Sequence, residues 1–341
     1  MNDAATLQDL VAEICASGRI TAQDVRNLRR QVFPDGVISD AEASAVFRLD
    51  HACTEKDGEW TRFYVDALTD YFVWQSAPKG YVGDSQAARL IAEISRDGRV
   101  DTTSELELLI NVVHWCTDCP EALAQLALQA VKESVLTPET GCYGSNRPPA
   151  VIAPGDVELI RKVIYAPGSP GGFTVTRGEA EFLVEIDRAT QGVENAPGWP
   201  DLFAKGVANA LMFPRGAPVV PDAAEATRRE RWLESRRSIG QLLGGIGRAV
   251  ARGDLGFGAA ARTLDPFGTY RDDAAAAAED TRVAEALQRE TIDAEEARWL
   301  VAHYSGDAHL SDSVVRLLRF IRENAPAVDP ALDPLFERAG V

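Results

Sequence analysis

The stretch Pro34-Asp35-Gly36-Val37-Ile38-Ser39-Asp40-Ala41-Glu42 decides the fold that we expect for this chain. A glycine turn leads into one apolar residue and a hydroxyl residue, and an acid follows three positions later. Ser39 and Glu42 match a capping box, in which the hydroxyl accepts from a backbone N–H of the first turn and the acid accepts from the backbone N–H of the cap. The helix dipole also favours negative charge at this end. The stretch therefore predicts a turn followed by the start of a helix.

Variants of this turn-and-cap pattern recur along the chain. Residues 90–100 repeat residues 10–20 without a gap, and six of the eleven positions are identical. This agreement favours an internal duplication. The second half of the chain also follows the first, with Asp50 matching Asp187 and Trp60 matching Trp199. The variants lie at residues 18–24, 97–105, 172–179 and 290–296, with a weaker one at 308–312.

Helical spacing of apolar residues dominates the chain, and alternation with period two is confined to a few residues. We therefore expect an all-α protein of two related helical lobes. The first lobe spans residues 1–140, and the second spans residues 157–341. Residues 141–156, which are rich in proline and glycine, form the linker between them. Single-residue β-bridges between the apolar turn positions are compatible with this fold.

The same turns have a second interpretation, as degenerate EF-hand loops that bind calcium. The second half of such a loop has glycine at position 6, an oxygen ligand at position 9 and glutamate at position 12. The turn before Glu42 fits that half, but Phe33 stands at position 3, where an oxygen ligand is needed. A frame that begins at Glu93 supplies more ligands. Capping alone is one interpretation, and the other is a calcium site formed by Glu93, Asp97 and Asp101 or by Asp35 and Glu42.

The order Asp-Gly-Val-Ile-Ser-Asp-Ala-Glu at residues 35–42, between two predicted amphipathic helices, resembles the tellurite-resistance TerB-like helical proteins. Residues 97–105 carry the same pattern in part. The resemblance covers residues 5–135 and, more loosely, residues 155–341. It implies small α-helical modules that are linked to stress response and to the membrane periphery, with acidic metal sites in some family members.

The formal charge of −17 over 341 residues limits the partners that we expect. Non-specific binding of nucleic acid needs clustered basic charge, so no nucleic-acid partner is expected. No apolar run is long enough to cross a membrane. The N-terminus, Met1-Asn2-Asp3, lacks the basic and apolar regions of a signal peptide. An odd number of cysteines, five, indicates reduced thiols and a cytoplasmic location.

Residues 223–252 are predicted to form a basic helix, inserted in the second lobe of this otherwise acidic chain. One interpretation is contact with a membrane surface or a protein partner, because the helix combines arginines with an apolar stripe. The other, which we favour, is an inter-lobe helix whose arginines meet the acidic lobes. The arginines that would make the membrane contact are Arg228, Arg229, Arg236 and Arg237.

The order Trp-Cys-Thr-Asp-Cys-Pro at residues 115–120 resembles a thioredoxin active site. The helices that we expect after it do not fit a thioredoxin-like chain. A zinc site has suitable ligand types in His114, Cys116, Cys119 and Cys142, but only one C-x-x-C is present. We favour a third interpretation, in which Cys116 and Cys119 are ordinary thiols at a helix junction.

No histidine shares a local motif with a nucleophile and an acid, so we expect no catalytic residue and no organic cofactor. Two functions of different classes fit the sequence. The first is a non-enzymatic helical interaction module with a protein partner, stress-linked or peripheral to the membrane as the resemblance implies. The alternative is a calcium-binding protein that uses the EF-hand-like turns. Neither the partner nor the oligomeric state follows from the sequence.

Overall fold

The computed structural model describes residues 3–32, 37–95, 98–139, 141–142, 148–172, 174–212, 227, 291–307 and 309–341. Regular structure in these ranges is almost entirely helical, which confirms the all-α expectation. No helix within them is both long and apolar enough to cross a membrane. Several residues singled out in the sequence lie outside these ranges: Asp35, Asp97, Arg228, Arg229, Arg236 and Arg237.

The first lobe contains several helices and one two-stranded ladder. In chain order the elements are α1 (Asp3–Ser17), β1 (Arg19–Ile20), α2 (Ala22–Val32), α3 (Asp40–Ala52), β2 (Glu55–Lys56), α4 (Gly58–Thr69), the π-helical turn η1 (Asp70–Trp74), α5 (Asp84–Ile94), α6 (Thr103–Trp115) and α7 (Glu121–Leu136). The second lobe contains α8 (Pro154–Ile164), α9 (Arg177–Ala189), α10 (Trp199–Met212), α15 (Ala294–Tyr304), α16 (Asp312–Asn324), the 3₁₀ turn η2 (Pro330–Leu332) and α17 (Asp333–Ala339).

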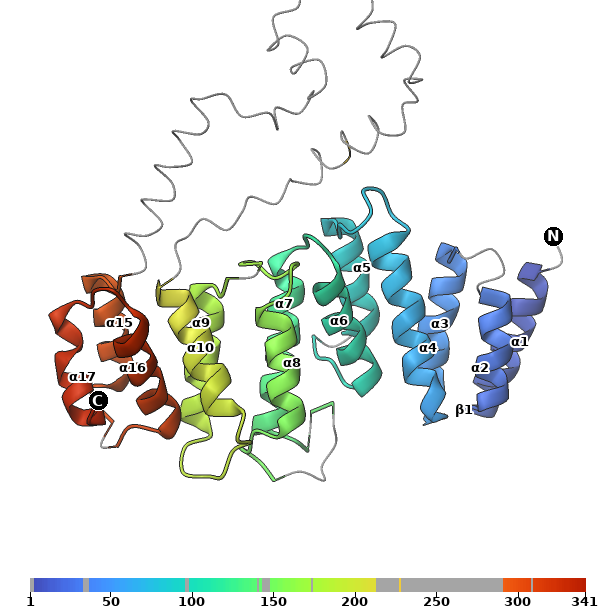
Figure 1. Cartoon of the computed structure of the whole chain (residues 1–341). Coiled ribbons are helices and arrows are strands. Elements are labelled where there is room, and N and C mark those ends of the chain that lie inside the picture. Colours follow the sequence, from blue (N-terminus) through green and yellow to red (C-terminus); the bar gives the residue numbers. More distant parts are fainter. Residues whose placement is uncertain are drawn as a thin grey trace, which may run out of the picture.

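The helices stand side by side in a row, so the described part of the molecule is elongated (Figure 1). Helices α1 and α2 lie at one end of the row, and α15 to α17 lie at the other. Apolar side chains of neighbouring helices join into one continuous buried core. Helix α4 shows why: Trp60, Tyr64, Ala67 and Leu68 recur at helical spacing and are all fully buried.

The capping boxes predicted from the sequence are present. Glu42 Oε2 accepts from the Ser39 backbone N–H at 2.7 Å and from the Ser39 hydroxyl at 2.7 Å. Thr176 with Glu179 and Asp293 with Glu296 form the same box. In residues 97–105 the cap is Thr102, with Glu105 as its acid. Each copy of the turn-and-cap pattern therefore begins a helix, as expected.

A short backbone contact recurs four times in the described part of the row, as a parallel pairing in three places and as a single hydrogen bond in the fourth. It joins the chain just before one helix to the chain just before the second helix after it. The ladder of β1 with β2 joins the segments before α2 and α4, and single bridges pair Tyr81 with Asp118 and Ile292 with Val328. In the second lobe, the Ala196 N–H donates to the Ile152 carbonyl at 2.8 Å. These contacts define four three-helix modules: α2–α3–α4, α5–α6–α7, α8–α9–α10 and α15–α16–α17.

The modules associate in pairs through two extensive helix contacts. Helix α4 of the first module packs on α6 of the second, and α10 of the third packs on α16 of the fourth. These pairs fall within the first and second lobes expected from the sequence. The lobes also touch each other, because α8 packs against α6 and α7. Within the expected linker, the Ala150 N–H donates to the Val135 carbonyl at 2.8 Å.

Candidate functional site

A buried aspartate lies at the centre of each lobe. Asp50, near the end of α3, accepts from the Trp60 indole N–H at 2.6 Å and from the Lys56 ammonium at 2.7 Å. The Ser104 hydroxyl, on α6 of the next module, donates to the same carboxylate at 3.1 Å. A buried carboxylate is costly unless it is paired and hydrogen-bonded, and these three donors satisfy it.

Asp187 has a similar position in the second lobe. It accepts from the Trp199 indole N–H at 2.9 Å and from the Ser311 hydroxyl at 2.8 Å. Ser311 begins α16 of the fourth module, as Ser104 lies in the first turn of α6. Both aspartates therefore connect the second and third helices of one module to the second helix of the next.

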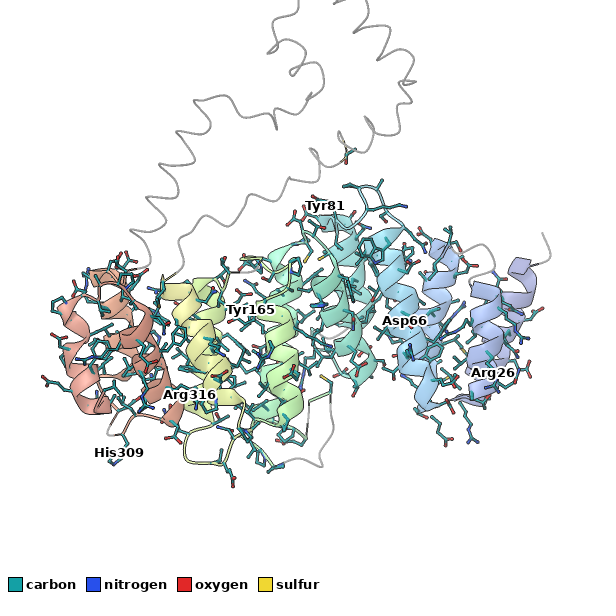
Figure 2. The ribbon with its side chains drawn as sticks, in the orientation of Figure 1. Arg26, Asp66, Tyr81, Tyr165, His309 and Arg316 are labelled. Carbon is teal, nitrogen blue, oxygen red and sulfur yellow. The ribbon has the colours of Figure 1, made fainter. Side chains whose placement is uncertain are left out.

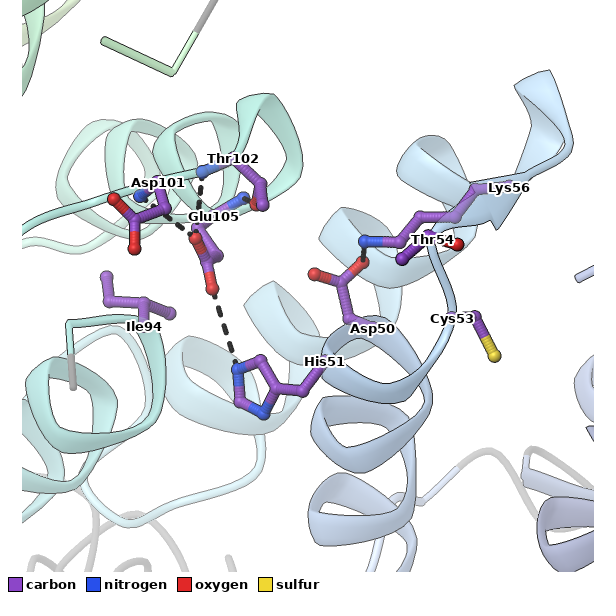
Figure 3. A pocket seen from close by; sticks show the side chains of 9 residues that line it. All are labelled: Asp50, His51, Cys53, Thr54, Lys56, Ile94, Asp101, Thr102 and Glu105. Atoms are coloured by element: carbon purple, nitrogen blue, oxygen red, sulfur yellow. Dashed lines mark hydrogen bonds and ion pairs between the residues drawn. The ribbon is translucent and has the colours of Figure 1, made fainter. Parts of the chain in front are cut away.

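A pocket of about 570 Å³ opens beside Asp50, between the end of α3 and the start of α6 (Figure 3). Its walls combine charged side chains, hydroxyls and two apolar residues. The lining residues are Asp50, His51, Cys53, Thr54, Lys56, Ile94, Asp101, Thr102 and Glu105.

Glu105 is the second buried carboxylate of this pocket. Its side chain is 7% exposed. Its Oε2 accepts from the backbone N–H groups of Thr102 at 3.0 Å and Asp101 at 3.3 Å. Its Oε1 faces His51 Nε2 at 3.5 Å, which is longer than an ordinary hydrogen bond (Figure 3). One carboxylate oxygen thus serves the helix cap, and the other faces the pocket.

Three acidic side chains act on the buried Tyr64 hydroxyl next to this pocket. Burial raises the pKa of the neighbouring Tyr64 hydroxyl well above its usual value, and the charges of Asp50, Glu105 and Glu93 raise it further. The Lys56 ammonium is held by Asp50, so it neutralises that carboxylate.

The residues predicted to bind calcium do not all lie together in the described structure. Glu93 is half-buried near the end of α5, and Asp101 is exposed just before α6, at the rim of the pocket. Glu42 is the capping acid of α3. The ranges given above contain no group of three or more histidine, cysteine or acidic side chains that could hold a metal ion.

The C-x-x-C motif is enclosed. Cys116 is fully buried and Cys119 is 9% exposed. The Cys119 thiol donates to the Gly168 carbonyl at 3.1 Å, so the glycine-rich loop of the second lobe covers the motif. A hydrogen bond with Cys119 and burial raise the pKa of Cys116. Because both redox chemistry and zinc ligation need the thiolate, this environment favours ordinary thiols.

Two exposed tryptophans lie near the bridge that joins the segments before α5 and α7 of the second module. Trp74, at the end of η1, is 43% exposed, and Trp115, at the end of α6, is 55% exposed. Between them the Thr117 N–H donates to the Gly80 carbonyl at 2.6 Å. The next residue, Tyr81, lies at the upper edge of the row in Figure 2. We call this area the tryptophan surface.

The fold and these sites define an all-α row of three-helix modules with a polar pocket and a separate aromatic surface. No family model, curated protein or solved structure matches the chain. The sequence predicts the Asp50–Asp187 and Trp60–Trp199 correspondences but neither the pocket nor the tryptophan surface. The residues His51 and Lys56, which line the pocket beside Asp50, belong to no motif in the sequence that would mark a site.

Proposed function

We propose that the chain is a non-enzymatic interaction module, and that a protein partner binds at the tryptophan surface. The observation that carries this proposal is the exposure of Trp74 and Trp115 on adjoining elements. Tryptophan supplies a large apolar area with a polar N–H, and it is enriched among the residues that dominate binding energy at protein interfaces.

The backbone beneath these side chains is well fixed, which favours binding. The Gly80 N–H donates to the Val73 carbonyl at 2.7 Å, and the Gly80 carbonyl accepts from Thr117. A side chain at residue 80 would meet Thr117 Oγ1 at 3.0 Å and approach the Trp74 ring to 3.9 Å. A surface that is already ordered loses less entropy when a partner binds.

The TerB-like resemblance supports a stress-linked role at the membrane periphery, and the five cysteines without a disulfide among them support a cytoplasmic location. Calcium binding is the alternative function. Glu93 and Asp101 favour it, because they lie at the two ends of the turn between α5 and α6. The Glu42 variant described in the Discussion tests this alternative.

The test is affinity capture with the full chain and with the double variant Trp74→Ala/Trp115→Ala. We expect proteins captured by the wild type to be depleted at least about tenfold by the double variant, since a residue at the centre of an interface contributes about 2 kcal/mol or more. Val193→Ala is the control, because Val193 is 44% exposed and belongs to the second lobe. Capture that is equal in all three proteins would contradict the proposal.

A further inference from the structure

We propose that the carboxyl group of Glu179 makes the contact between α7 and α9 depend on pH. The contact is closed while this group is protonated. It opens, together with the loop that precedes α9, when the group ionises. This device goes beyond the proposed function, because neither Trp74 nor Trp115 takes part in it.

The contact between α7 and α9 is the least extensive of three equivalent contacts along the row. The third helix of one module packs on the second helix of the next, as α4 does on α6, α7 on α9 and α10 on α16. Asp50 and Asp187 add buried hydrogen bonds to the first and last of these contacts. The position of α6 that corresponds to these aspartates, counted from the helix cap, is the apolar Val113. The contact of α7 with α9 is therefore the one that can open most easily, while α8 keeps the lobes joined through α6 and α7.

Glu179 is buried in the first turn of α9, with 4% of its surface exposed. Its Oε2 accepts from the backbone N–H of Thr176 at 2.8 Å and from the Thr176 hydroxyl at 2.9 Å. Its Oε1 is also buried and has no hydrogen-bond partner among the described residues. A buried charge that lacks donors is costly, and a proton on the carboxyl removes that cost. The closed contact therefore favours the protonated form.

The groups around Glu179 oppose its ionisation. Burial raises the pKa of Glu179 to about 7, the hydrogen bonds from Thr176 lower this pKa, and the charge of Glu121 at the start of α7 raises it. Tyr165, the residue after α8, is the other titratable group that interacts with it. Burial raises the pKa of the Tyr165 hydroxyl, and the charge of Glu179 raises it further. An ionised Glu179 thus meets a second carboxylate across the contact.

Cations on the surrounding helices are engaged elsewhere. Lys132 of α7 pairs with Glu185, farther along α9, at 2.6 Å. The Arg177 guanidinium lies over an aromatic ring of α15, and Lys205 of α10 pairs within its own helix. None of these three cations is among the groups that alter the pKa of Glu179.

The loop that covers the C-x-x-C motif is attached to the same helix cap. The connection from α8 to α9 contains Gly168 and ends at Thr176, whose N–H and hydroxyl are held by the Glu179 carboxylate. The Gly168 carbonyl accepts from the Cys119 thiol of the first lobe at 3.1 Å. When an ionised Glu179 turns towards water, it draws this cap and the loop away from Cys119. The reactivity of the Cys119 thiol therefore reports whether the contact is closed.

The direction of the pH effect follows from the proton on Glu179. In the closed contact its pKa is about 7, and in water its carboxyl returns to the ordinary value of 4.5. The closed form keeps a proton that the open form releases between these two values. Raising the pH from 4.5 to about 7 therefore favours opening. Above about pH 7 both forms are ionised, so a further rise in pH has no additional effect.

The experiment treats the full chain with an activated pyridyl disulfide and follows the modification of Cys119 by mass spectrometry over a series of pH values. The intrinsic reactivity of the thiol varies with pH in every variant, so the measured quantity is the ratio of the wild-type rate to the Glu179→Gln rate. Glutamine stays neutral, and its amide oxygen can still accept from the Thr176 N–H and maintain the cap. We expect the ratio to rise at least about tenfold between pH 5 and pH 7 and to level off above pH 7.

Glu42→Gln is the matched control, because it makes the same substitution in the capping box of α3. The ratio of the wild-type rate to its rate should not change with pH. Glu121→Gln tests the same contact from α7 and leaves Glu179 in place. Without the second carboxylate the pKa of Glu179 should fall. When Glu179→Gln is compared with the wild type in the Glu121→Gln background, the ratio should therefore rise less and level off at a lower pH.

A ratio of wild type to Glu179→Gln that stays constant or falls between pH 5 and pH 7 would overturn the proposal. A rise of the same size in the ratio of wild type to Glu42→Gln would also overturn it. If circular dichroism shows that Glu179→Gln is unfolded, the wild type and Glu121→Gln are compared directly. The same pH dependence of the Cys119 rate in these two proteins would then overturn the proposal.

Discussion

At the scale of single residues, Asp50 and Asp187 have similar positions but different partners. Asp50 accepts from a lysine as well as from neutral donors, whereas the donors to the Asp187 side chain are the neutral Trp199 and Ser311. Removing one partner of a buried ion pair costs about 3–5 kcal/mol, and leaving buried neutral donors unsatisfied costs about 1–3 kcal/mol.

We therefore expect Asp50→Ala to lower the free energy of unfolding by about 3–5 kcal/mol. Asp187→Ala should lower it by about 1–3 kcal/mol. Urea unfolding followed by circular dichroism measures both changes. Equal losses in the two variants would show that the ion pair between Lys56 Nζ and Asp50 Oδ1, at 2.7 Å, does not add to the free energy of unfolding.

A second residue-scale prediction concerns Glu179. Burial raises its pKa from the ordinary value of 4.5 to about 7. The folded protein therefore keeps a proton that the unfolded chain releases between these two values. The contribution of Glu179 to stability is full below pH 4.5 and is lost as the pH rises through about 7, a change of up to about 3 kcal/mol.

Glu179→Gln should flatten this part of the pH profile. The expected result is a smaller fall in the free energy of unfolding between pH 5 and pH 8 than in the wild type. Other ionisable groups contribute equally to both proteins, so the difference between the profiles isolates Glu179. Profiles of the same slope would show that the carboxylate is already ionised at pH 5.

At the scale of elements, Glu42 separates capping from calcium binding. Its Oε2 accepts twice from Ser39, so Glu42→Gln should retain the cap and cost less than about 1 kcal/mol. As a position-12 ligand it would supply bidentate coordination, which glutamine cannot replace. We expect calcium to leave the melting temperatures of the wild type and of Glu42→Gln unchanged. A melting temperature that rises with calcium in the wild type alone would establish the metal site.

The loop that covers the C-x-x-C motif gives a second prediction at this scale. A Cβ at Gly168 would lie 2.2 Å from Cys116 Sγ and 2.6 Å from the Val113 carbonyl oxygen. Gly168→Ala must therefore displace the loop. We expect Cys116 and Cys119 to react with a thiol reagent many times faster than in the wild type.

Gly155→Ala is the control for this prediction, because a Cβ there meets nothing within 4 Å. Its thiols should react as slowly as those of the wild type. Slow reaction in both variants would mean that the two thiols are protected by something other than the loop.

The helices and their caps could be predicted because their determinants are local. Ser39 and Glu42 are three residues apart, and a capping box needs nothing else. The grouping into modules could not be predicted, because the bridge between Tyr81 and Asp118 uses backbone atoms and leaves no pattern of side chains. The pocket was missed for another reason. Its lining residues His51 and Ile94 come from different modules and become neighbours only through folding.

At the scale of the whole molecule, the two lobes share a core but contain separate buried aspartates. Helices α7 and α8 pack together, and Lys132 pairs with Glu185 across the lobes at 2.6 Å. We expect fragments 1–147 and 148–341 to be helical when expressed separately. Burial of their apolar interface should drive them to associate when they are mixed.

Size-exclusion chromatography would detect the complex, and thiol labelling would verify its geometry. Cys119 should react in the isolated first fragment and become protected when the second fragment supplies Gly168. A second fragment that carries Gly168→Ala should not restore this protection. Fragments without helical circular dichroism would show that neither lobe folds without the other.

The contact between α10 and α16 joins parts of the chain that are far apart in the sequence, since α10 ends at Met212 and α16 begins at Asp312. Contacts of large sequence separation form more slowly during folding than local ones, because more of the chain must be ordered before they form. The packing of α10 on α16 is extensive, so it stabilises the second lobe once it has formed. We therefore expect the third and fourth modules to associate late in folding, after their own helices have formed.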